Sequence, residues 1–320
     1  WSKLELDLKK GALETDIKAL KKAARQTVGP ELEKRIQIII DTSLIELHND
    51  FKIYWNKSAI AKIVSGKDYL NPSIELLVDD ILEQIQKKKL TEFLEKWIGN
   101  KINTILKSLI DLKDLQERNS SIKALAYQLY ESNGVLKRDQ VDEYLNVLGQ
   151  NERKILRDLG VKFGRYHVFL HKLIKPDAVS LRTLLWKNYY QKDFHLKPPT
   201  FGLNFINDKN LQNKNFMLLC GFEKFKNFFV RIDILERLFV QIINSNFGKN
   251  NEVKVIPEML NLLGCSKSNF KDLLKEMNYK IIEKNNEIYL KYKPKKNNKK
   301  IFKKSEKESP FGILKSLNLN

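Results

Sequence analysis

Three groups of residues could carry chemistry in this sequence, and a nucleotide site is the first to consider. A loop that cradles nucleotide phosphates needs the spacing G-x-x-x-x-G-K-[ST]. Gly66-Lys67 and Gly248-Lys249 lack both the upstream glycine and the Ser or Thr that must follow the lysine. Asp142-Glu143 falls on a predicted amphipathic helix, not at a strand end where a carboxylate could hold Mg²⁺. The sequence therefore predicts no ATP site and no catalytic residue in this chain.

The histidines and cysteines form the second group. His167 and His171 are four residues apart, a spacing that puts two imidazoles on one face of a helix as metal ligands. The residues between them, 168–170, are apolar and strand-like, and no nearby Glu or Cys completes a site. We therefore predict packing or a phosphate contact for the two histidines and no metal. Cys220 and Cys265 read as small core residues.

The third group is basic and is the better functional candidate. One set lies on a predicted helix and the wing that follows it, where Lys291 also falls; a second set lies on an earlier helix and strand. A positive groove with an aromatic side chain suits tracking of a single strand by phosphate contacts and base stacking. The candidate nucleic-acid-binding residues are Lys267, Asn269, Lys271, Lys275, Lys280, Lys284, Arg153, Lys154, Arg157, Lys162, Arg165 and Tyr166.

A simpler reading exists for each of these side chains taken alone, because a lysine such as Lys271 or Lys275 can merely solvate a helix. The clustered set favours binding. The whole chain has 58 Lys and Arg against 39 Asp and Glu, a net charge of +19, which favours a polyanionic partner. No stretch approaches 18 uncharged apolar residues, so we expect no membrane insertion. Two cysteines fit a reducing, cytoplasmic compartment.

The elements that must position these residues give a mainly α fold with small β elements, an α+β class. Residues 1–115 read as a helical region with a small β-sheet. Within it, residues 13–41 predict two helices broken at Gly29-Pro30, and 44–55 predict a β-hairpin followed by a strand over 59–64. Residues 74–115 return to helical spacing.

The rest of the chain predicts a helix-turn-helix or winged-helix-like unit and then a winged-helix domain. Residues 116–195 hold three short helices and then an extended run, and 231–293 hold helix, helix, turn, helix and a hairpin wing around Asn285-Asn286. The units share Asn-x-Leu-Gly before the third helix, at 146–149 and 261–264. A looser stretch, 196–230, reads as a linker, and 294–320 as a Lys-rich disordered tail with a terminal hydrophobic hook.

The middle of the sequence resembles a known family. The strings are Leu159–Leu170 (LGVKFGRYHVFL), Leu173–Pro176 (LIKP), Leu184–Trp186 (LLW), Ala124–Leu129 (ALAYQL), Arg231–Leu238 (RIDILERL), Leu263–Ser266 (LGCS) and Ser309–Phe311 (SPF). They are similar, in order, to the C-terminal region of alphaproteobacterial superfamily-two DExH helicases, which are related to the mitochondrial degradosome (suppressor-of-var) helicase. The resemblance implies an ATP-driven RNA or DNA helicase whose two RecA-like motor domains, with their ATP and Mg²⁺, lie upstream of this chain.

On this basis we expect an accessory region that guides a strand for the motor. Its expected partners are single-stranded RNA or DNA, the upstream RecA-like domains of the same polypeptide, and proteins of RNA degradation. The start at Trp1, inside a strand-like run, suggests that the true beginning is elsewhere. Two alternatives stay open: a free-standing winged-helix DNA-binding regulator, and a scaffold whose basic face contacts an acidic protein.

Overall fold

The protein, described here by a computed structural model, has an α+β fold. The structure describes residues 14–42, 44–78, 82–115, 120–192, 194–207, 213–245, 252–285 and 287–292. The predicted tail at 294–320 and the strand-like run near Trp1 lie outside these residues. Two compact units form the chain: residues 1–244 with 258–265, and residues 245–257 with 266–320.

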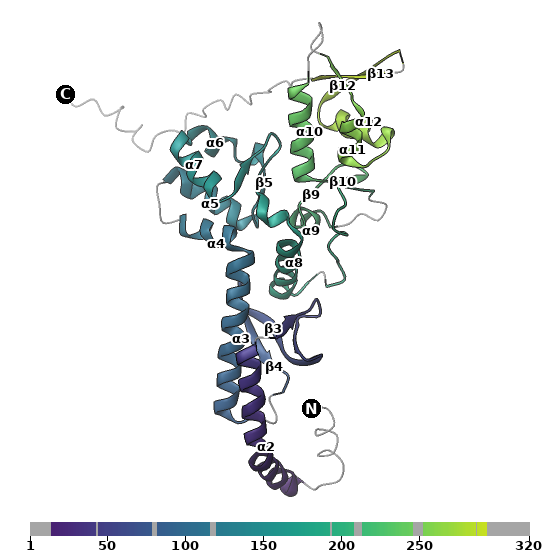
Figure 1. Cartoon of the computed structure of the whole chain (residues 1–320). Coiled ribbons are helices and arrows are strands. Elements are labelled where there is room, and N and C mark those ends of the chain that lie inside the picture. The colour runs from purple at the N-terminus through teal and green to yellow at the C-terminus, as the bar shows by residue number, and fades with distance from the viewer. Residues whose placement is uncertain are drawn as a thin grey trace, which may run out of the picture. The chain divides into compact units, whose positions relative to one another are not determined.

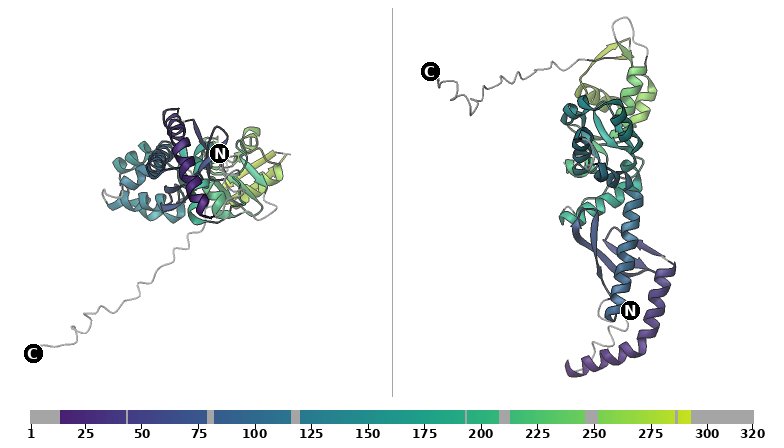
Figure 2. Two further views of the ribbon diagram at one scale, coloured as in Figure 1. Left: turned by 90° about the horizontal axis from the view of Figure 1, so that it is seen from below. Right: turned by 90° about the vertical axis from the view of Figure 1, so that its left-hand side faces the viewer.

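The first helix corrects one expectation. The sequence predicts two helices over residues 13–41, but α2 (Glu14–Thr42) is a single helix with Pro30 inside it. Figure 2 shows that this helix bends along its length. A proline removes one backbone hydrogen bond and clashes with the preceding turn, so it can bend a helix without ending it. Leu32, Ile36 and Ile39 on the following turns are buried, and this packing stabilises the helix past the bend.

A four-stranded antiparallel sheet of order β1-β2-β3-β4 follows. The expected hairpin is confirmed by β1 (Ile45–Leu47) and β2 (Lys52–Trp55), and the expected strand by β3 (Ser58–Asp68). The helical prediction from residue 74 is wrong at its start, because β4 (Asn71–Leu76) pairs with β3. The turn explains this, since the Asp68 carboxylate accepts from the Leu70 N–H at 2.9 Å and so fixes a hairpin.

The helical stretch then begins at residue 84. It consists of α3 (Gln84–Ile105) and α4 (Lys107–Asp114). In α3 the buried positions Leu90, Leu94, Ile98 and Ile102 repeat every four residues, which gives the helix one apolar face. Figure 1 shows that α3 lies beside α2 and the sheet and leads into α4.

The first of three repeats has the predicted order of elements with an added strand. Its elements are α5 (Ser120–Glu131), β5 (Val135–Lys137), the 3₁₀ turn Arg138–Gln140, α6 (Asp142–Val147), α7 (Gln150–Asp158), β6 (Val161–Phe163) and β7 (His167–Leu170). The sheet order is β5-β7-β6, with all pairs antiparallel. A helix, a strand and two further helices thus lead into the β6–β7 hairpin, called the wing below, and β7 of this hairpin pairs with β5.

A second repeat replaces the expected linker. A 3₁₀ turn (His171–Ile174) leads into α8 (Pro176–Tyr190), and then come β8 (Phe205–Asn207), α9 (Lys214–Leu219), β9 (Phe222–Lys224) and β10 (Phe228–Arg231). The sheet order, β8-β10-β9, matches that of the first repeat. The linker prediction for 196–230 is therefore wrong. Strands of three and four residues, preceded by the Pro198-Pro199 pair and interspersed with Asn and Lys, are too short to show a clear alternation.

Arg182 on α8 connects these two repeats. It is fully buried, and its guanidinium donates to the backbone carbonyls of Asn133, Leu173 and Leu219. These carbonyls lie at the end of α5, in the 3₁₀ turn and at the end of α9. Each would otherwise be a buried acceptor without a donor, which is costly. One side chain of the second repeat thus satisfies backbone groups of both.

The order of the first repeat, with two helices between its first and second strands, occurs again near the end of the chain, whereas the second repeat has only α9 at that place. This third repeat runs through α10 (Ile232–Asn244), β11 (Val253–Lys254), α11 (Pro257–Leu263), α12 (Lys267–Glu276), β12 (Tyr279–Lys284) and β13 (Glu287–Tyr292), with sheet order β11-β13-β12. The predicted wing is confirmed, and Asn285 in its turn has the expected positive φ, 51°. Helix α10 and all of α11 after Pro257 belong to the first compact unit, and the remaining elements belong to the second.

A left-handed residue marks the entry to the wing in all three repeats. Gly160, Gly221 and Asn278 follow α7, α9 and α12 with φ of 95°, 85° and 66°. Glycine and asparagine tolerate this conformation best, because other side chains clash with the backbone. The next residue is buried in each case: Val161, Phe222 and Tyr279. The repeat therefore extends beyond the shared Asn-x-Leu-Gly.

Candidate nucleic-acid interface and a buried polar network

The predicted binding residues of the first repeat divide between surface and interior. Lys154, Arg157, Lys162 and Arg165 are exposed. Arg153 is bonded within the fold, because its guanidinium donates to the carbonyls of Leu145 and Leu148 at 2.5 and 3.2 Å. These carbonyls lie at the end of α6, so Arg153 caps that helix.

The aromatic candidate Tyr166 is also engaged inside the fold. Its ring packs edge-on against Phe239 of α10, with 5.7 Å between ring centroids. The guanidinium of Arg165 lies 6.0 Å from the same Phe239 ring, while that of Arg157 lies 5.7 Å from Phe163. Tyr166 therefore contributes to packing between the first wing and α10. The structure does not place it as an open platform for a base.

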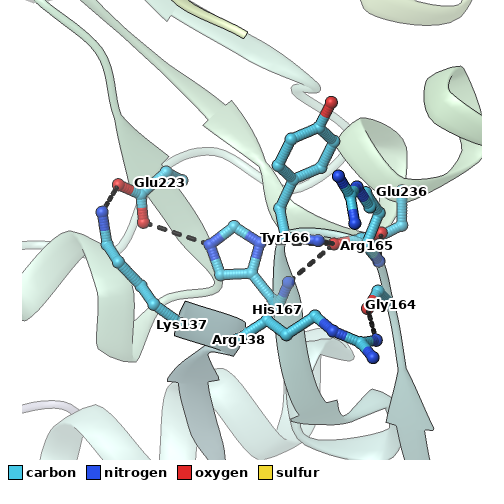
Figure 3. A network of polar contacts seen from close by, with 8 residues as sticks. All are labelled: Lys137, Arg138, Gly164, Arg165, Tyr166, His167, Glu223 and Glu236. Carbon is cyan, nitrogen blue, oxygen red and sulfur yellow. Dashed lines mark hydrogen bonds and ion pairs between the residues drawn. The ribbon is translucent and has the colours of Figure 1, made fainter. Parts of the chain in front are cut away.

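The turn of the first wing is held by Glu236 of α10, as Figure 3 shows. The Glu236 carboxylate accepts from the consecutive backbone N–H groups of Arg165, Tyr166 and His167, at 2.5, 2.9 and 2.8 Å. Three aligned N–H groups form a concave anion site, which here takes a carboxylate of the chain itself. Gly164 allows this approach, because a Cβ at that position would overlap the carboxyl group of Glu236.

His167 lies behind this turn with only 2% of its surface exposed. Its Nε2 is 3.2 Å from Oε2 of Glu223 on β9, and its Nδ1 is 3.5 Å from Oε1 of Glu236. Lys137 on β5 donates to the other oxygen of Glu223 at 2.5 Å. Figure 3 shows the imidazole between the two carboxylates. Residues from β5, β7, β9 and α10 thus meet in one network.

The charges of this network shift two pKa values in opposite directions. Burial alone lowers the pKa of His167, but hydrogen bonding and the charges of Glu223 and Glu236 outweigh burial and raise it. Burial likewise raises the pKa of Glu223, but His167 and Lys137 outweigh it and lower it. The ionised forms of both groups are therefore favoured in the folded protein.

The network around His167 is not a candidate metal site among the described residues. Within the described ranges no group of three or more His, Cys, Asp or Glu residues could hold a metal ion. His171, unlike His167, is exposed, and it begins the 3₁₀ turn after β7. Cys220 is buried, as predicted, and burial raises its thiol pKa to about 12, whereas Cys265, also predicted as a core residue, is only half-buried. What the network can do is fix the first wing against β9 and α10.

Sequence reasoning missed Glu223 and Glu236. Each is a single acidic residue in an element whose other signals are apolar, and each meets His167 across 56 or more residues of chain. Alignment of the repeats could have pointed to Glu223. It is the second residue of β9, at the position that Lys162 occupies in β6, so a charged residue stands at the same place in both wings.

The predicted residues of α12 are partly neutralised. Ser266 caps this helix, as expected, by accepting from the Asn269 N–H at 3.2 Å. Lys271 pairs with Glu283 at 2.6 Å, and Lys275 lies 3.6 Å from Asp272. Lys267 is exposed. The outer surface of α12 therefore mixes both signs of charge.

The wing places the remaining candidates on one side of its sheet. Lys280 and Lys291 are directly opposite each other on β12 and β13. Lys284, at the tip of the wing, pairs with Glu252 at 2.8 Å. All three lysines are exposed.

Comparisons with known proteins give one partial similarity. The chain is 28% identical over 155 residues to Methionine--tRNA ligase 1 of Alkaliphilus oremlandii (strain OhILAs), which covers 44% of this chain and 28% of the length of that enzyme. No family model matches the sequence. No solved structure matches it either. Within the described residues, no helix has the length and apolar character needed to span a bilayer.

Proposed function

We propose that this chain is the C-terminal, nucleic-acid-handling accessory region of an ATP-dependent RNA or DNA helicase. The observation that carries the proposal is the succession of three repeats with the same three-stranded sheet order, which we interpret as winged-helix-like units, in a chain of net charge +19. Winged-helix units are common nucleic-acid-binding modules, and a strongly basic surface adds phosphate affinity that is independent of sequence. The resemblance of the strings at 159–170 and 231–238 to helicases is the reason for inferring motor domains.

In this function the chain contributes position and electrostatics. RecA-like domains upstream bind ATP and Mg²⁺ and move the strand. The exposed cations of the repeats hold the strand between cycles of hydrolysis, because many weak phosphate contacts resist slipping while permitting movement along the backbone. The buried network around His167 keeps the first wing in place, so that these cations are presented on a rigid support.

Binding of a single-stranded oligonucleotide across a salt series tests this proposal. The full chain is titrated into a labelled 20-nucleotide RNA, the matching DNA strand and the duplex, with fluorescence anisotropy as the readout. We expect weak binding to single strands at low salt, with an affinity that falls steeply as salt rises. An affinity for single strands too weak to detect at low salt would contradict the proposal.

A free-standing DNA-binding regulator is the alternative function. It would insert α12 into a major groove, which requires base-reading side chains on that helix. The pairing of Lys271 with Glu283 and of Lys275 with Asp272 does not favour it. Preference for one duplex sequence would support the regulator. Helicase motifs in the codons upstream of Trp1 would exclude it. Transfer RNA is a useful third probe, since the partly similar enzyme is by its name a tRNA ligase.

A further inference from the structure

The sheet of the second compact unit has one face turned to the core and one to solvent. Successive side chains of a strand point to opposite faces. Val253, Tyr279 and Leu290 are buried, so they define the core face. The residues that alternate with them, and that face one another in the strand register, define the outer face, which consists of Lys254, Lys280, Ile282, Lys284, Glu287, Tyr289 and Lys291.

The charge on this outer face is uneven. At the wing tip the lysines are neutralised, since Lys284 pairs with Glu252 and Lys254 pairs with Glu287. At the other end Lys280 lies directly opposite Lys291, and no carboxylate in the described part of the chain forms an ion pair with either. Like charges directly opposite on neighbouring strands repel each other. A bound anion relieves that repulsion.

An aromatic side chain lies next to this lysine pair. Tyr289 is half-buried in the register row beside Lys280 and Lys291, between Lys254 and Ile282 on the neighbouring strands. Its hydroxyl donates to Glu287 at 2.8 Å, and the ammonium of Lys284 lies 5.7 Å from the ring centroid. The ring is therefore anchored at its tip, with cations on both sides along the strand direction.

We propose that this outer sheet face, and not the surface of α12, is where the second unit binds single-stranded nucleic acid. Lys280 and Lys291 contact phosphates, and Tyr289 with Ile282 supports a base. The inference rests on the proposed function, to which it adds a site. A phosphate backbone complements the lysine pair, and every base has a flat face that can stack on an aromatic ring. An acidic peptide would satisfy the lysines but leave the neighbouring ring without a role.

Two double variants of the full chain separate the two surfaces. Lys280→Glu with Lys291→Glu changes the sheet face, and Lys271→Glu with Lys275→Glu changes α12 while altering the net charge equally. With a labelled 20-nucleotide RNA, we expect the sheet variant to bind at least about tenfold more weakly, with a salt slope lower by about 1.4, or about 0.7 for each phosphate that is no longer neutralised. The α12 variant should bind less than about threefold more weakly. Equal effects, or a larger effect for α12, would overturn the proposal.

The aromatic contact has its own test. We expect Tyr289→Leu to weaken binding of the 20-nucleotide RNA about fivefold or more and to leave binding of an abasic strand of the same length unchanged, because only the former has bases to stack. Equal effects on both strands would mean that Tyr289 supports the fold without touching a base.

A single substitution separates loss of binding from loss of folding. Lys280→Glu puts a carboxylate opposite Lys291, so the melting temperature should stay level or rise while RNA affinity falls. If Lys280→Glu unfolds the unit, Lys280→Gln with Lys291→Gln decides the matter by the same titration. Failure of the wild-type chain to bind RNA would overturn the proposed function. Wild-type binding that every sheet variant keeps would overturn the sheet site alone. Tight binding to anionic vesicles, competing with RNA, would point instead to a lipid surface.

Discussion

The first compact unit buries several charged residues, whereas the described residues of the second compact unit include no buried charge. In the first, Arg182, His167 and Glu223 are buried, and each is bound to partners from other elements. In the second, the charged side chains of α12 and the wing lie on the surface, where Lys271 and Lys284 make exposed pairs and Lys280 makes none among the described residues. The two units share a sheet topology, so the difference comes from side chains and not from the fold.

This comparison separates charges that hold the structure together from charges that are available to a partner. A buried charge needs partners, because leaving it without any in a medium of low dielectric constant is expensive. An exposed cation has no such requirement and contributes little to stability. Burial is therefore the feature that decides which of the many cations in this chain are candidates for a polyanion.

The largest expected effect is at Arg182. Changing Arg182→Met leaves the carbonyls of Asn133, Leu173 and Leu219 buried without their donor. We expect the free energy of unfolding to fall by about 3–5 kcal/mol, measured by urea denaturation. The exposed Arg157→Met is the matched control and should change it by less than about 0.5 kcal/mol. Similar decreases for both variants would break the distinction between buried and exposed charges.

The next effect is at the first wing turn. Gly164→Ala pushes a methyl group into the carboxyl group of Glu236, so we expect a decrease of about 1–3 kcal/mol in the free energy of unfolding. Glu236→Ala alone removes the acceptor of three N–H groups and should cost about 2 kcal/mol. The double variant should be more stable than the sum of the two decreases predicts. Strict additivity would show that the two residues do not contact each other.

A smaller, pH-dependent effect is expected at His167. Its pKa is raised in the folded state, so its contribution to stability is full below the ordinary histidine pKa and is lost as the pH rises through the raised value. We therefore expect the stability advantage of the wild type over His167→Gln to shrink steadily as the pH rises above the ordinary histidine pKa, followed by urea denaturation. Glu223 acts at the other end, because its lowered pKa means that its contribution is lost only as the pH falls below the ordinary glutamate range. An advantage that grows with pH would contradict the network.

The smallest effect is expected at Lys271. Its partner Glu283 has 63% of its side chain exposed, so solvent and salt screen the pair. Lys271→Gln should leave the melting temperature of the chain unchanged within error, by differential scanning fluorimetry. A clear drop would show that the surface of α12 is structural, which would weaken its use as a control for the sheet face.

Much of the local structure can be predicted from the sequence, because it follows from local patterns. The hairpin at 45–55, the helices of the first and third repeats and the wing around Asn285 all show as apolar periodicity and turn residues. The second repeat does not, since its three short strands resemble a loop in composition. Pro30 predicts a break between two helices, although it lies inside α2. The sequence alone does not reveal whether packing stabilises a helix on both sides of a proline.

The candidate site shows the same division. The sequence by itself determined that the chain is strongly basic, that it lacks the spacing of a phosphate loop, and which stretches hold the cations. Only the tertiary structure decided that Arg153 and Tyr166 face inward, that Glu223 and Glu236 flank His167, and that Lys280 faces Lys291 across a sheet. The physical reason is range: helix and turn propensities act over a few residues, whereas burial and charge pairing depend on which distant segments pack together.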